Sequence, residues 1–459
     1  MGIQTRVGEL LSRTVEGLSN RPVVNHISPE EIREELRNFD FHKPMEIGEA
    51  AERVVGLLTG GMVHMMHPGY FGLFNPSVLF PGIVADLITA SLNPQLAVWS
   101  HAPVPVEIER YTIDAIGELC GWEPEVTAGH FTTGGAEANY TAVLMALTRA
   151  SATYSEIGAR AFTGQPRLYV SAESHLAWLQ IAHQAGIGRE AVQLIATDGG
   201  GRMNPAFLAA AIDADRTAGD VPVFVAATAG TTNAGMIDPL EDCEAIARAK
   251  GLWFHVDAAW GGAGLMSPRS AVHLKGIEKA DSITFDAHKW FAVPMGAGMF
   301  LCRDNALLGE TFRVSASYMP ESTEATIDPY THSMQWSRRF IGLKLFLSLA
   351  CIGWHGYRDH VEHALEMSDR LSKHLTAHGW RVVNDSALAV VCFVDDHEST
   401  DLAQIAADVV SDGRAWISAA KFEERTVLRA CMTSHFTRDE HLHGLIDALN
   451  QARTAQVAQ

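Results

Sequence analysis

Two charged side chains in the middle of the sequence follow apolar runs that are typical of buried strands. Lys289 follows residues 282–285, and Asp257 closes the run 253–256. An amine beside Trp290 is partly removed from water, which lowers its proton affinity and makes it a good Schiff-base nucleophile. Ligands of α/β proteins bind at the carboxyl ends of strands, so the pair indicates a site at that edge. A surface lysine and an N-cap aspartate are the structural alternatives.

A glycine-rich segment indicates a second kind of site. Residues 132–139 have the sequence TTGGAEAN and continue into a helical pattern, so Gly134 and Gly135 lie where the chain enters a helix. The free N–H groups and the positive end of a helix bind anions, and glycine lets a phosphate approach closely. His175, beyond the strand-like residues 168–170, could stack on a flat ligand. An ordinary helix entry and a structural histidine are the alternatives for each feature taken alone.

These four features together match the needs of one cofactor. Pyridoxal phosphate requires a Schiff-base lysine, an acidic residue for its pyridinium nitrogen, a flat side chain on its ring face and a cradle for its phosphate. The sequence therefore predicts a pyridoxal phosphate site that contains Lys289, Asp257, His175 and the glycine segment.

The elements that must position these residues alternate between strands and helices. The predicted strands are residues 168–170, 221–227, 253–256, 282–285 and 299–301, with further strands at 381–383, 388–394 and 427–431. Strands that alternate with amphipathic stretches predict βαβ units and a mostly parallel sheet. We therefore expect an α/β protein with three parts: an N-terminal helical segment (1–100), a large cofactor-binding domain (101–340) and a small α+β C-terminal domain (341–459), the last entered through two long helical patterns.

Composition excludes several classes of function. The chain of 459 residues has 35 basic and 54 acidic side chains, and the net charge of −19 argues against nucleic acids and anionic membranes as partners. The six cysteines contain no CxxC pair, which suggests neither a disulfide framework nor a zinc or other metal site. The sequence contains no apolar run of about 18 residues and no signal-peptide core, so we expect a cytoplasmic protein that binds a small molecule.

The sequence resembles the group II amino-acid decarboxylases, a family of the pyridoxal phosphate fold-type-I superfamily that includes aromatic amino-acid, glutamate and cysteine-sulfinate decarboxylases. The motifs that carry the resemblance are in the family's order: the glycine segment, His175, residues 228–232 (TAGTT), residues 255–262 (HVDAAWGG) and residues 288–290 (HKW). The resemblance implies an aspartate-aminotransferase-like fold, a homodimer with shared active sites, and decarboxylation of an L-amino acid to the amine and CO2.

The resemblance also implies a role for individual residues. Lys289 would form the Schiff base with the cofactor, and Asp257 would keep the pyridine nitrogen protonated so that the ring accepts the electron pair left by CO2. His175 would stack on one face of the ring, and Ala259 would pack on the other. The residues implied around the phosphate are Gly134, Gly135, Ala136, Thr232 and His288.

Tyr318 lies at the position of the family's loop tyrosine, which delivers a proton to Cα of the substrate. Related aldehyde synthases have phenylalanine at that position, and oxygen then leads to an aldehyde. Tyr318 therefore favours plain decarboxylation over the alternative function, an oxygen-dependent aldehyde synthase on the same scaffold. A tyrosine with only a packing role is the structural alternative.

The class of substrate is suggested by residues 67–74 (HPGYFGLF). Acidic-substrate members of the family have Asn and Gln where this chain has Gly72 and Leu73, so no amide is left here to bind a distal carboxylate. Leu73, Phe74 and Trp99 suggest an apolar wall and therefore an aromatic or large apolar amino acid. Simple core packing is the alternative for each of them.

Two residues depart from the family's pattern, and an arginine pair resembles it. Asp286 replaces the family's usual asparagine, which puts a carboxylate near the phosphate unless it turns away or pairs with a cation. Ala136 replaces a common serine, so one hydroxyl contact to the phosphate is missing. Arg338 and Arg339 resemble an arginine pair of the family, for which an anion-binding role and an ordinary ion pair are both open.

Overall fold

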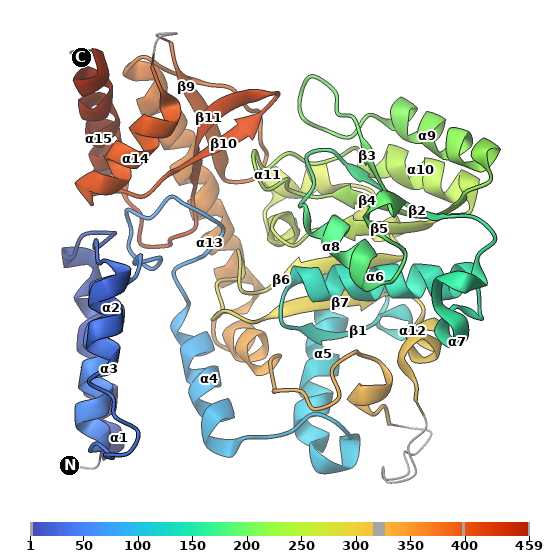
Figure 1. Cartoon of the computed structure of the whole chain (residues 1–459), viewed down its shortest axis with the longest axis horizontal. Coiled ribbons are helices and arrows are strands. Elements are labelled where there is room, and N and C mark those ends of the chain that lie inside the picture. The colour runs from blue at the N-terminus through green and yellow to red at the C-terminus, as the bar shows by residue number, and fades with distance from the viewer. Residues whose placement is uncertain (1–2, 315–325, 397–399, 458–459) are drawn as a thin grey trace. The chain divides into compact units, whose positions relative to one another are not determined.

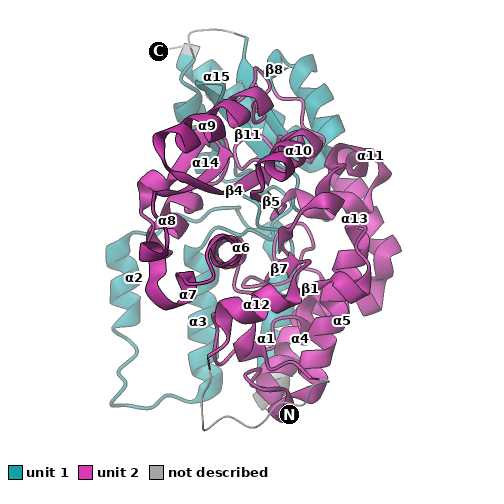
Figure 2. Ribbon diagram, turned by 90° about the vertical axis from the view of Figure 1, so that its right-hand side faces the viewer, with its two compact units in different colours: residues 1–77, 366–383, 391–459 teal, residues 78–365, 384–390 magenta. Residues whose placement is uncertain are grey.

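The structure, a computed structural model, describes residues 3–314, 326–396 and 400–457. The chain forms two compact units, shown in different colours in Figure 2: unit 1 comprises residues 1–77, 366–383 and 391–459, and unit 2 comprises residues 78–365 and 384–390. Within the described ranges, no helix is both long and apolar enough to cross a membrane.

Unit 2 is built on a seven-stranded sheet with the order β1-β7-β6-β5-β4-β2-β3 (Figure 1). The strands are β1 (Ala128–Thr132), β2 (Pro166–Ser171), β3 (Val192–Ile195), β4 (Val221–Thr228), β5 (Trp253–Asp257), β6 (Ser282–Asp286) and β7 (Gly298–Cys302). β7 runs antiparallel to both of its neighbours, and the other pairings are parallel. Every residue of β5, β6 and β7 is buried, as expected for a sheet covered by helices on both faces. The predicted mostly parallel α/β sheet is therefore confirmed.

Helices of unit 2 pack along this sheet. α6 (Gly135–Ala150) contacts β4 to β7, α8 (Ala177–Gln184) packs on α6, and α9 (Pro205–Ala218) and α10 (Leu240–Lys250) contact strands from β3 to β5. The other helices are α4 (Phe80–Leu92), α5 (Pro103–Leu119), α7 (Tyr154–Ile157), α11 (Pro268–Ala271), α12 (Asn305–Phe312) and the first part of α13 (Leu343–Ala377). α13 is two helices joined at Gly353, whose φ of 63° lies in the left-handed region that favours glycine. The two long helical patterns predicted here are these two halves.

Unit 1 combines helices with a four-stranded sheet of the order β10-β11-β9-β8. The strands are β8 (Trp380–Val382), β9 (Val390–Asp395), β10 (Ser418–Phe422) and β11 (Arg425–Cys431), and the helices are α1 (Ile3–Glu16), α2 (Pro29–Leu36), α3 (Ile47–Gly61), α14 (Leu402–Asp412) and α15 (Asp439–Val457). Ser28 and Glu31 cap the start of α2 reciprocally, which satisfies two backbone donors. The small α+β part predicted for the end of the chain is present.

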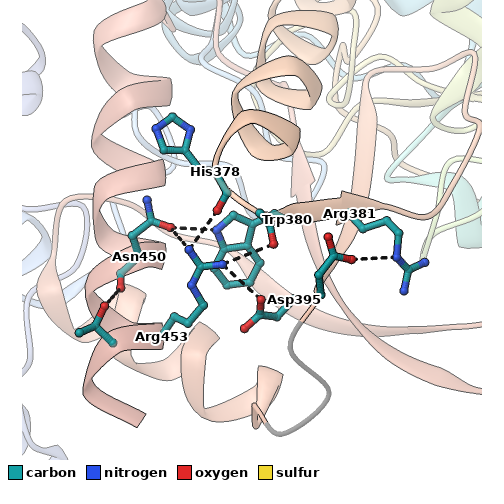
Figure 3. Close-up of polar contacts among 9 residues, drawn as sticks. His378, Trp380, Arg381, Asp395, Asn450 and Arg453 are labelled. Carbon is teal, nitrogen blue, oxygen red and sulfur yellow. Dashed lines mark hydrogen bonds and ion pairs between the residues drawn. The ribbon is translucent and has the colours of Figure 1, made fainter. Parts of the chain in front are cut away.

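One arginine joins α15 to the small sheet (Figure 3). The guanidinium of Arg453 donates to Asn450 (2.8 Å), to the carbonyl of His378 (3.0 Å) and to Asp395 (3.2 Å), and lies 4.8 Å from the ring centroid of Trp380. The indole of Trp380 also donates to Asn450 at 3.1 Å. Because Asp395 ends β9 and Trp380 begins β8, this network holds the C-terminal helix against the sheet edge.

Candidate active site

The carboxyl ends of several strands of unit 2 meet at one edge of its sheet. β4, β5 and β6 are parallel neighbours that end at Thr228, Asp257 and Asp286. Thr132 at the end of β1 and Asp286 at the end of β6 both pair with Gly298 of β7, so these two ends lie on either side of the same residue. The strand ends that carry Asp257 and Lys289 therefore lie at the edge where α6 begins.

The carboxylate of Asp257 is buried, and each of its two oxygens accepts a hydrogen bond from the protein. Its side chain belongs to a residue with 7% exposure. Oδ1 accepts the N–H of Ala259 at 3.1 Å, and Oδ2 accepts the side-chain amide of Asn139 at 2.8 Å. Asn139 lies on the second turn of α6, so the contact joins that helix to the end of β5. These two hydrogen bonds fix the orientation of the Asp257 carboxylate.

Lys289 lies in a tight turn directly after β6. Its Nζ is 3.0 Å from Oδ2 of Asp286, and its side chain is 25% exposed. The next residue, Trp290, stacks on Trp260 with a centroid distance of 4.7 Å and an interplanar angle of 5°. Since Trp260 follows β5 closely and Trp290 follows the lysine, this stacking holds the turn of Lys289 beside the end of β5.

The start of α6 forms a cradle with little space for side chains. A Cβ at Gly135 would lie 3.0 Å from Oδ2 of Asp286 and 3.4 Å from Cβ of Ala259, and a Cβ at Gly134 would lie 3.4 Å from the ring of His288. The N–H of Glu137 already donates to the carbonyl of Gly134 at 3.1 Å, so the donors left for a ligand are the N–H groups that come before it in the first helical turn. The cradle therefore offers N–H donors at close approach, as an oxyanion requires.

His288 is buried at the border of this cradle. Its Nδ1 accepts the N–H of Ala297 at 3.2 Å, so the proton of the neutral ring is on Nε2, which lies 3.8 Å from Oδ2 of Asp286. Burial lowers the pKa of His288, while the nearby Asp286 carboxylate raises it by less. The neutral ring thus presents an N–H donor to its surroundings.

Two further predicted cofactor residues lie in loops of unit 2. His175 follows β2, is exposed, and accepts the N–H of Ala177 on Nδ1 at 3.1 Å. Thr232 is half-buried, and the neighbouring Thr231 accepts the N–H of Met236 at 3.0 Å, which fixes the turn after β4. Their contacts with a cofactor stay predictions, and Tyr318 lies outside the described residues.

The predicted substrate residues are divided between the units. Trp99 belongs to unit 2, where its indole donates to Glu107 at 3.0 Å. Leu73 and Phe74 belong to unit 1, in which Leu73 is 47% exposed and Phe74 only 8%. The role of each in substrate binding therefore stays a prediction.

Unit 1 contains two features near Phe74 that the sequence patterns did not predict. A Cβ at Gly72 would lie 2.1 Å from the ring of Trp416, so Trp416 fills the space of any side chain at this position. Arg429 is 3% exposed, its guanidinium lies 4.8 Å from the ring centroid of Phe74, and its Nε and Nη2 have no hydrogen-bond partner among the described residues. An arginine inside the apolar run VLRAC of β11 was the available signal.

The arginine pair forms ion pairs in the structure. Arg338 is buried against Glu109 at 2.5 Å and also donates to the carbonyl of Phe131, whereas Arg339 is half-exposed and pairs with Asp86 at 3.0 Å. Burial raises the pKa of Glu109 more than Arg338 lowers it. An anion-binding role and an ordinary ion pair were both open for these arginines, and the structure shows each of them in an ion pair.

Comparison with known proteins gives a consistent family. Residues 29–395 match the model of the pyridoxal-dependent decarboxylase conserved domain. An aromatic-L-amino-acid decarboxylase of Bacillus atrophaeus is 26% identical over 95% of this chain and 91% of its own length. The acidic amino acid decarboxylase GADL1 of Bos taurus is 32% identical over 71% of this chain and 63% of its own length.

Solved structures agree with the sequence comparison. The crystal structure of mouse CSAD is 27% identical and superimposes with a TM-score of 0.89 over 97% of this chain and 98% of its own. Since the family model covers most of the chain, the resemblance inferred from its motifs is confirmed. The chain belongs to the family of pyridoxal-dependent decarboxylases.

Proposed function

We propose that this pyridoxal phosphate-dependent amino-acid decarboxylase converts an aromatic or large apolar L-amino acid into the amine and CO2. Family membership supports the reaction class and the cofactor. The relatives named above include one aromatic and one acidic decarboxylase, so the choice of substrate class rests on the residues of this chain.

The edge of the unit 2 sheet fits pyridoxal phosphate. The start of α6 offers N–H donors, and the absence of a side chain at Gly135 leaves a phosphate room that a Cβ, 3.0 Å from Asp286, would take. Lys289 supplies an amine, and Asp257 supplies a buried carboxylate with two fixed donors. The carboxylate of Asp286 is unfavourable for this fit, because its negative charge would repel a dianionic phosphate.

Bound pyridoxal phosphate supplies a ring that accepts the electron pair left when CO2 departs. In the proposal, Lys289 holds the cofactor covalently, and Asp257 keeps a proton on the pyridine nitrogen by its negative charge. His175 and Ala259 cover the two faces of the ring. The residues proposed around the phosphate are Gly134, Gly135, Ala136, Thr232 and His288.

The observation that carries the substrate class is the pair Gly72 and Trp416. The family's acidic members use an amide side chain at this position, and here the Trp416 ring lies 2.1 Å from where its Cβ would be. An amide cannot enter without moving the indole, whereas an apolar wall of Trp416 and Phe74 suits an apolar substrate.

Arg429 adds a candidate for the substrate carboxylate. Two of its nitrogens lack hydrogen-bond partners within the described part of the chain, and a buried guanidinium in this state favours an anion. The carboxylate of an amino-acid substrate is such an anion.

Competition kinetics test the substrate class. We expect kcat/KM for phenylalanine, tyrosine or tryptophan to exceed that for glutamate, aspartate or cysteine sulfinate by at least about 100-fold. Leu73→Gln should lower kcat/KM for the aromatic substrates, while Leu11→Gln, at a leucine of unit 1 with 48% exposure against 47%, should not. A preference for acidic substrates would contradict the proposal.

Tyr318 is proposed to protonate the substrate at Cα. Product analysis in air and without oxygen tests this role. The native protein should release amine in both atmospheres, and Tyr318→Phe should shift product to aldehyde in air. Aldehyde from the native protein would instead favour the aldehyde synthase.

We further propose, on the family resemblance alone, that the enzyme is a cytoplasmic homodimer. Sedimentation of the cofactor-loaded protein tests the dimer: a species of about 100 kDa, twice the 49.9 kDa chain, is expected. A monomer that retains full activity would contradict it.

A further inference from the structure

A chain of buried hydrogen bonds leads through unit 2 to the carboxylate of Asp257. The indole N–H of Trp253 donates to Oγ of Ser282 at 2.8 Å, and this hydroxyl lies 2.8 Å from Nδ1 of His255. Nε2 of His255 lies 3.0 Å from Oδ1 of Asn139, whose amide nitrogen is 2.8 Å from Oδ2 of Asp257. All five residues are buried, so water does not compete for these bonds.

The chemistry of the groups gives this chain one direction. Trp253 can only donate, so Ser282 accepts from it and keeps its own hydroxyl proton for Nδ1 of His255. His255 then carries its proton on Nε2 and donates to Oδ1 of Asn139. The amide of Asn139 therefore faces Asp257 with its N–H, and an ionised carboxylate is the acceptor that completes the series.

If every hydrogen bond of the series were reversed, one donor would be left without an acceptor. A protonated Asp257 would donate to Asn139, and Nδ1–H of His255 would donate to Ser282. Ser282 would then accept both from His255 and from Trp253, and its own hydroxyl proton would have no acceptor within the chain. A buried polar group left in this state costs stability, so the direction towards an ionised Asp257 is favoured.

Aromatic neighbours hold the imidazole in the orientation that this direction needs. The ring of Phe224 stacks on His255 at 5.6 Å with an angle of 24°, and the edge contact of Trp178 is at 5.9 Å. Burial lowers the pKa of His255 to about 4, against a smaller opposite effect of Asp257, so the ring is neutral near pH 7. Because the ring of His255 is neutral and its plane is fixed, the property that remains to be determined is which of its two nitrogens carries the proton.

We infer that Asn139, His255 and Ser282 are positioning residues that keep Asp257 ionised and aimed at the pyridine nitrogen of the cofactor. The inference rests on the proposed role of Asp257. A carboxylate that receives N–H donors from Asn139 and Ala259 is stabilised as the anion. The negative charge then favours a protonated pyridine nitrogen. The series of hydrogen bonds from Trp253 through Ser282, His255 and Asn139, here called the relay, fixes the orientation of the Asp257 carboxylate.

The tautomer of His255 tests the relay without the cofactor. In nitrogen-15 NMR of the cofactor-free protein with labelled histidine, we expect the His255 signals to show the proton on Nε2, and His255→Gln identifies those signals by their loss. A proton on Nδ1 would overturn the inference, because it corresponds to the reversed chain and a protonated Asp257.

The cofactor ring reports the consequence. With pyridoxal phosphate labelled at its ring nitrogen, the native protein should show the protonated nitrogen. Asn139→Ala should shift this signal towards the unprotonated form and weaken cofactor binding by about tenfold, since it removes one donor to a buried charge. Thr141→Val is the matched control on α6, because its buried hydroxyl donates to the carbonyl of Glu137 and takes no part in the series from Trp253 to Asp257, and it should change neither readout.

A conservative series separates positioning from folding. His255→Gln keeps an N–H donor of similar reach towards Asn139 and should retain most of the ring protonation, while His255→Leu should lose it; thermal unfolding checks that both variants fold. Equal ring signals in the native protein, Asn139→Ala and His255→Leu would overturn the relay and leave the proposed function intact. A native protein that binds no pyridoxal phosphate would instead contradict the proposed function, and the tautomer measurement would still test the relay.

Discussion

Asp286 and Lys289 have opposite charges and lie on the same turn, and their side chains meet at 3.0 Å. The same carboxylate oxygen faces the start of α6, where a Cβ on Gly135 would lie 3.0 Å away. Its other oxygen is buried and has no hydrogen-bond partner among the described residues. The pairing anticipated at this position, carboxylate with a cation, is therefore present, and the carboxylate still faces the cradle.

Asp286→Asn should bind pyridoxal phosphate more tightly, because it removes a negative charge beside the dianionic phosphate. We expect the dissociation constant, measured by fluorescence titration, to fall by about tenfold, which corresponds to about 1.4 kcal/mol. Glu190→Gln is a control with the same change of charge, since exposed Glu190 precedes β3 at the amino edge of the sheet. Weaker or unchanged binding in Asp286→Asn would show that the carboxylate does not act on the phosphate.

Individual elements depend on close contacts between glycine and aromatic rings. Within unit 1, the segment that contains Gly72 hydrogen-bonds the segment of Trp416, with the N–H of Phe71 donating to the carbonyl of Trp416 at 2.8 Å. The rings of Tyr70 and Trp416 pack at 5.3 Å. Only a residue without a side chain allows the indole to lie over position 72.

Gly72→Ala should therefore destabilise unit 1. A Cβ 2.1 Å from the Trp416 ring forces the indole to move, and overpacking of this kind costs about 1–3 kcal/mol of unfolding free energy. Gly56→Ala in α3 has no atom within 4 Å of the new Cβ and should stabilise by about 0.5–1 kcal/mol. Chemical denaturation of both variants measures the difference, and equal stabilities would contradict the packing argument.

Among the strands, the sequence predicts those with a clear apolar run and misses those without one. Apolar runs identified β2, β4, β5, β6 and β7, whose observed bounds differ from prediction by a few residues. β1, β3 and β10 were missed, because β1 contains Gly129 and His130, β3 has only four residues, and β10 is partly exposed and contains Lys421 next to its last residue. A short or mixed strand has no clear apolar pattern, and its pairing with distant strands provides the stability that its own sequence lacks.

The site shows the same limit. Lys289, Asp257 and the glycine pair were predicted because each lies next to a recognisable strand or helix start. Asn139 and Trp416 were not, since the contact of Asn139 with Asp257 spans 118 residues of sequence and depends on how α6 crosses β5. Such contacts follow from the packing of elements and have no local signal.

The molecule as a whole should be sensitive to acid through its buried histidines. The imidazole of His130 in β1 is 5% exposed, and neither ring nitrogen has a hydrogen-bond partner among the described residues. Burial, with the positive charge of Arg338 and then His332, lowers its pKa well below the usual 6.5. The unfolded chain therefore binds a proton below about pH 6.5 that the folded protein does not, and stability falls as the pH falls.

His130→Phe removes this proton linkage. Phenylalanine should pack against Phe300, which lies 5.7 Å from the imidazole, and the variant should be at least as stable as the native protein at pH 8. Below about pH 6.5 its advantage should grow by up to about 1.4 kcal/mol per pH unit. Burial raises the pKa of Asp238 to about 7 and acts in the opposite sense, but this contribution is common to both proteins and cancels.

Urea denaturation between pH 4.5 and 8 measures this difference, with exposed His42→Phe as the control. The control should have the same pH profile as the native protein, because His42 meets water in the folded and unfolded states alike. Parallel profiles for His130→Phe and the native protein would mean that His130 is protonated in the folded state.

Borohydride reduction of the cofactor-loaded enzyme tests the central claim most directly, namely that Lys289 binds pyridoxal phosphate covalently. Reduction makes the Schiff base permanent, so proteolysis and mass spectrometry locate the modified residue. We predict the cofactor mass on the peptide that contains Lys289 and no modification in Lys289→Arg. Modification of Lys344, whose buried amine donates to the carbonyl of Met295 at 2.8 Å, or of no lysine at all would contradict the account.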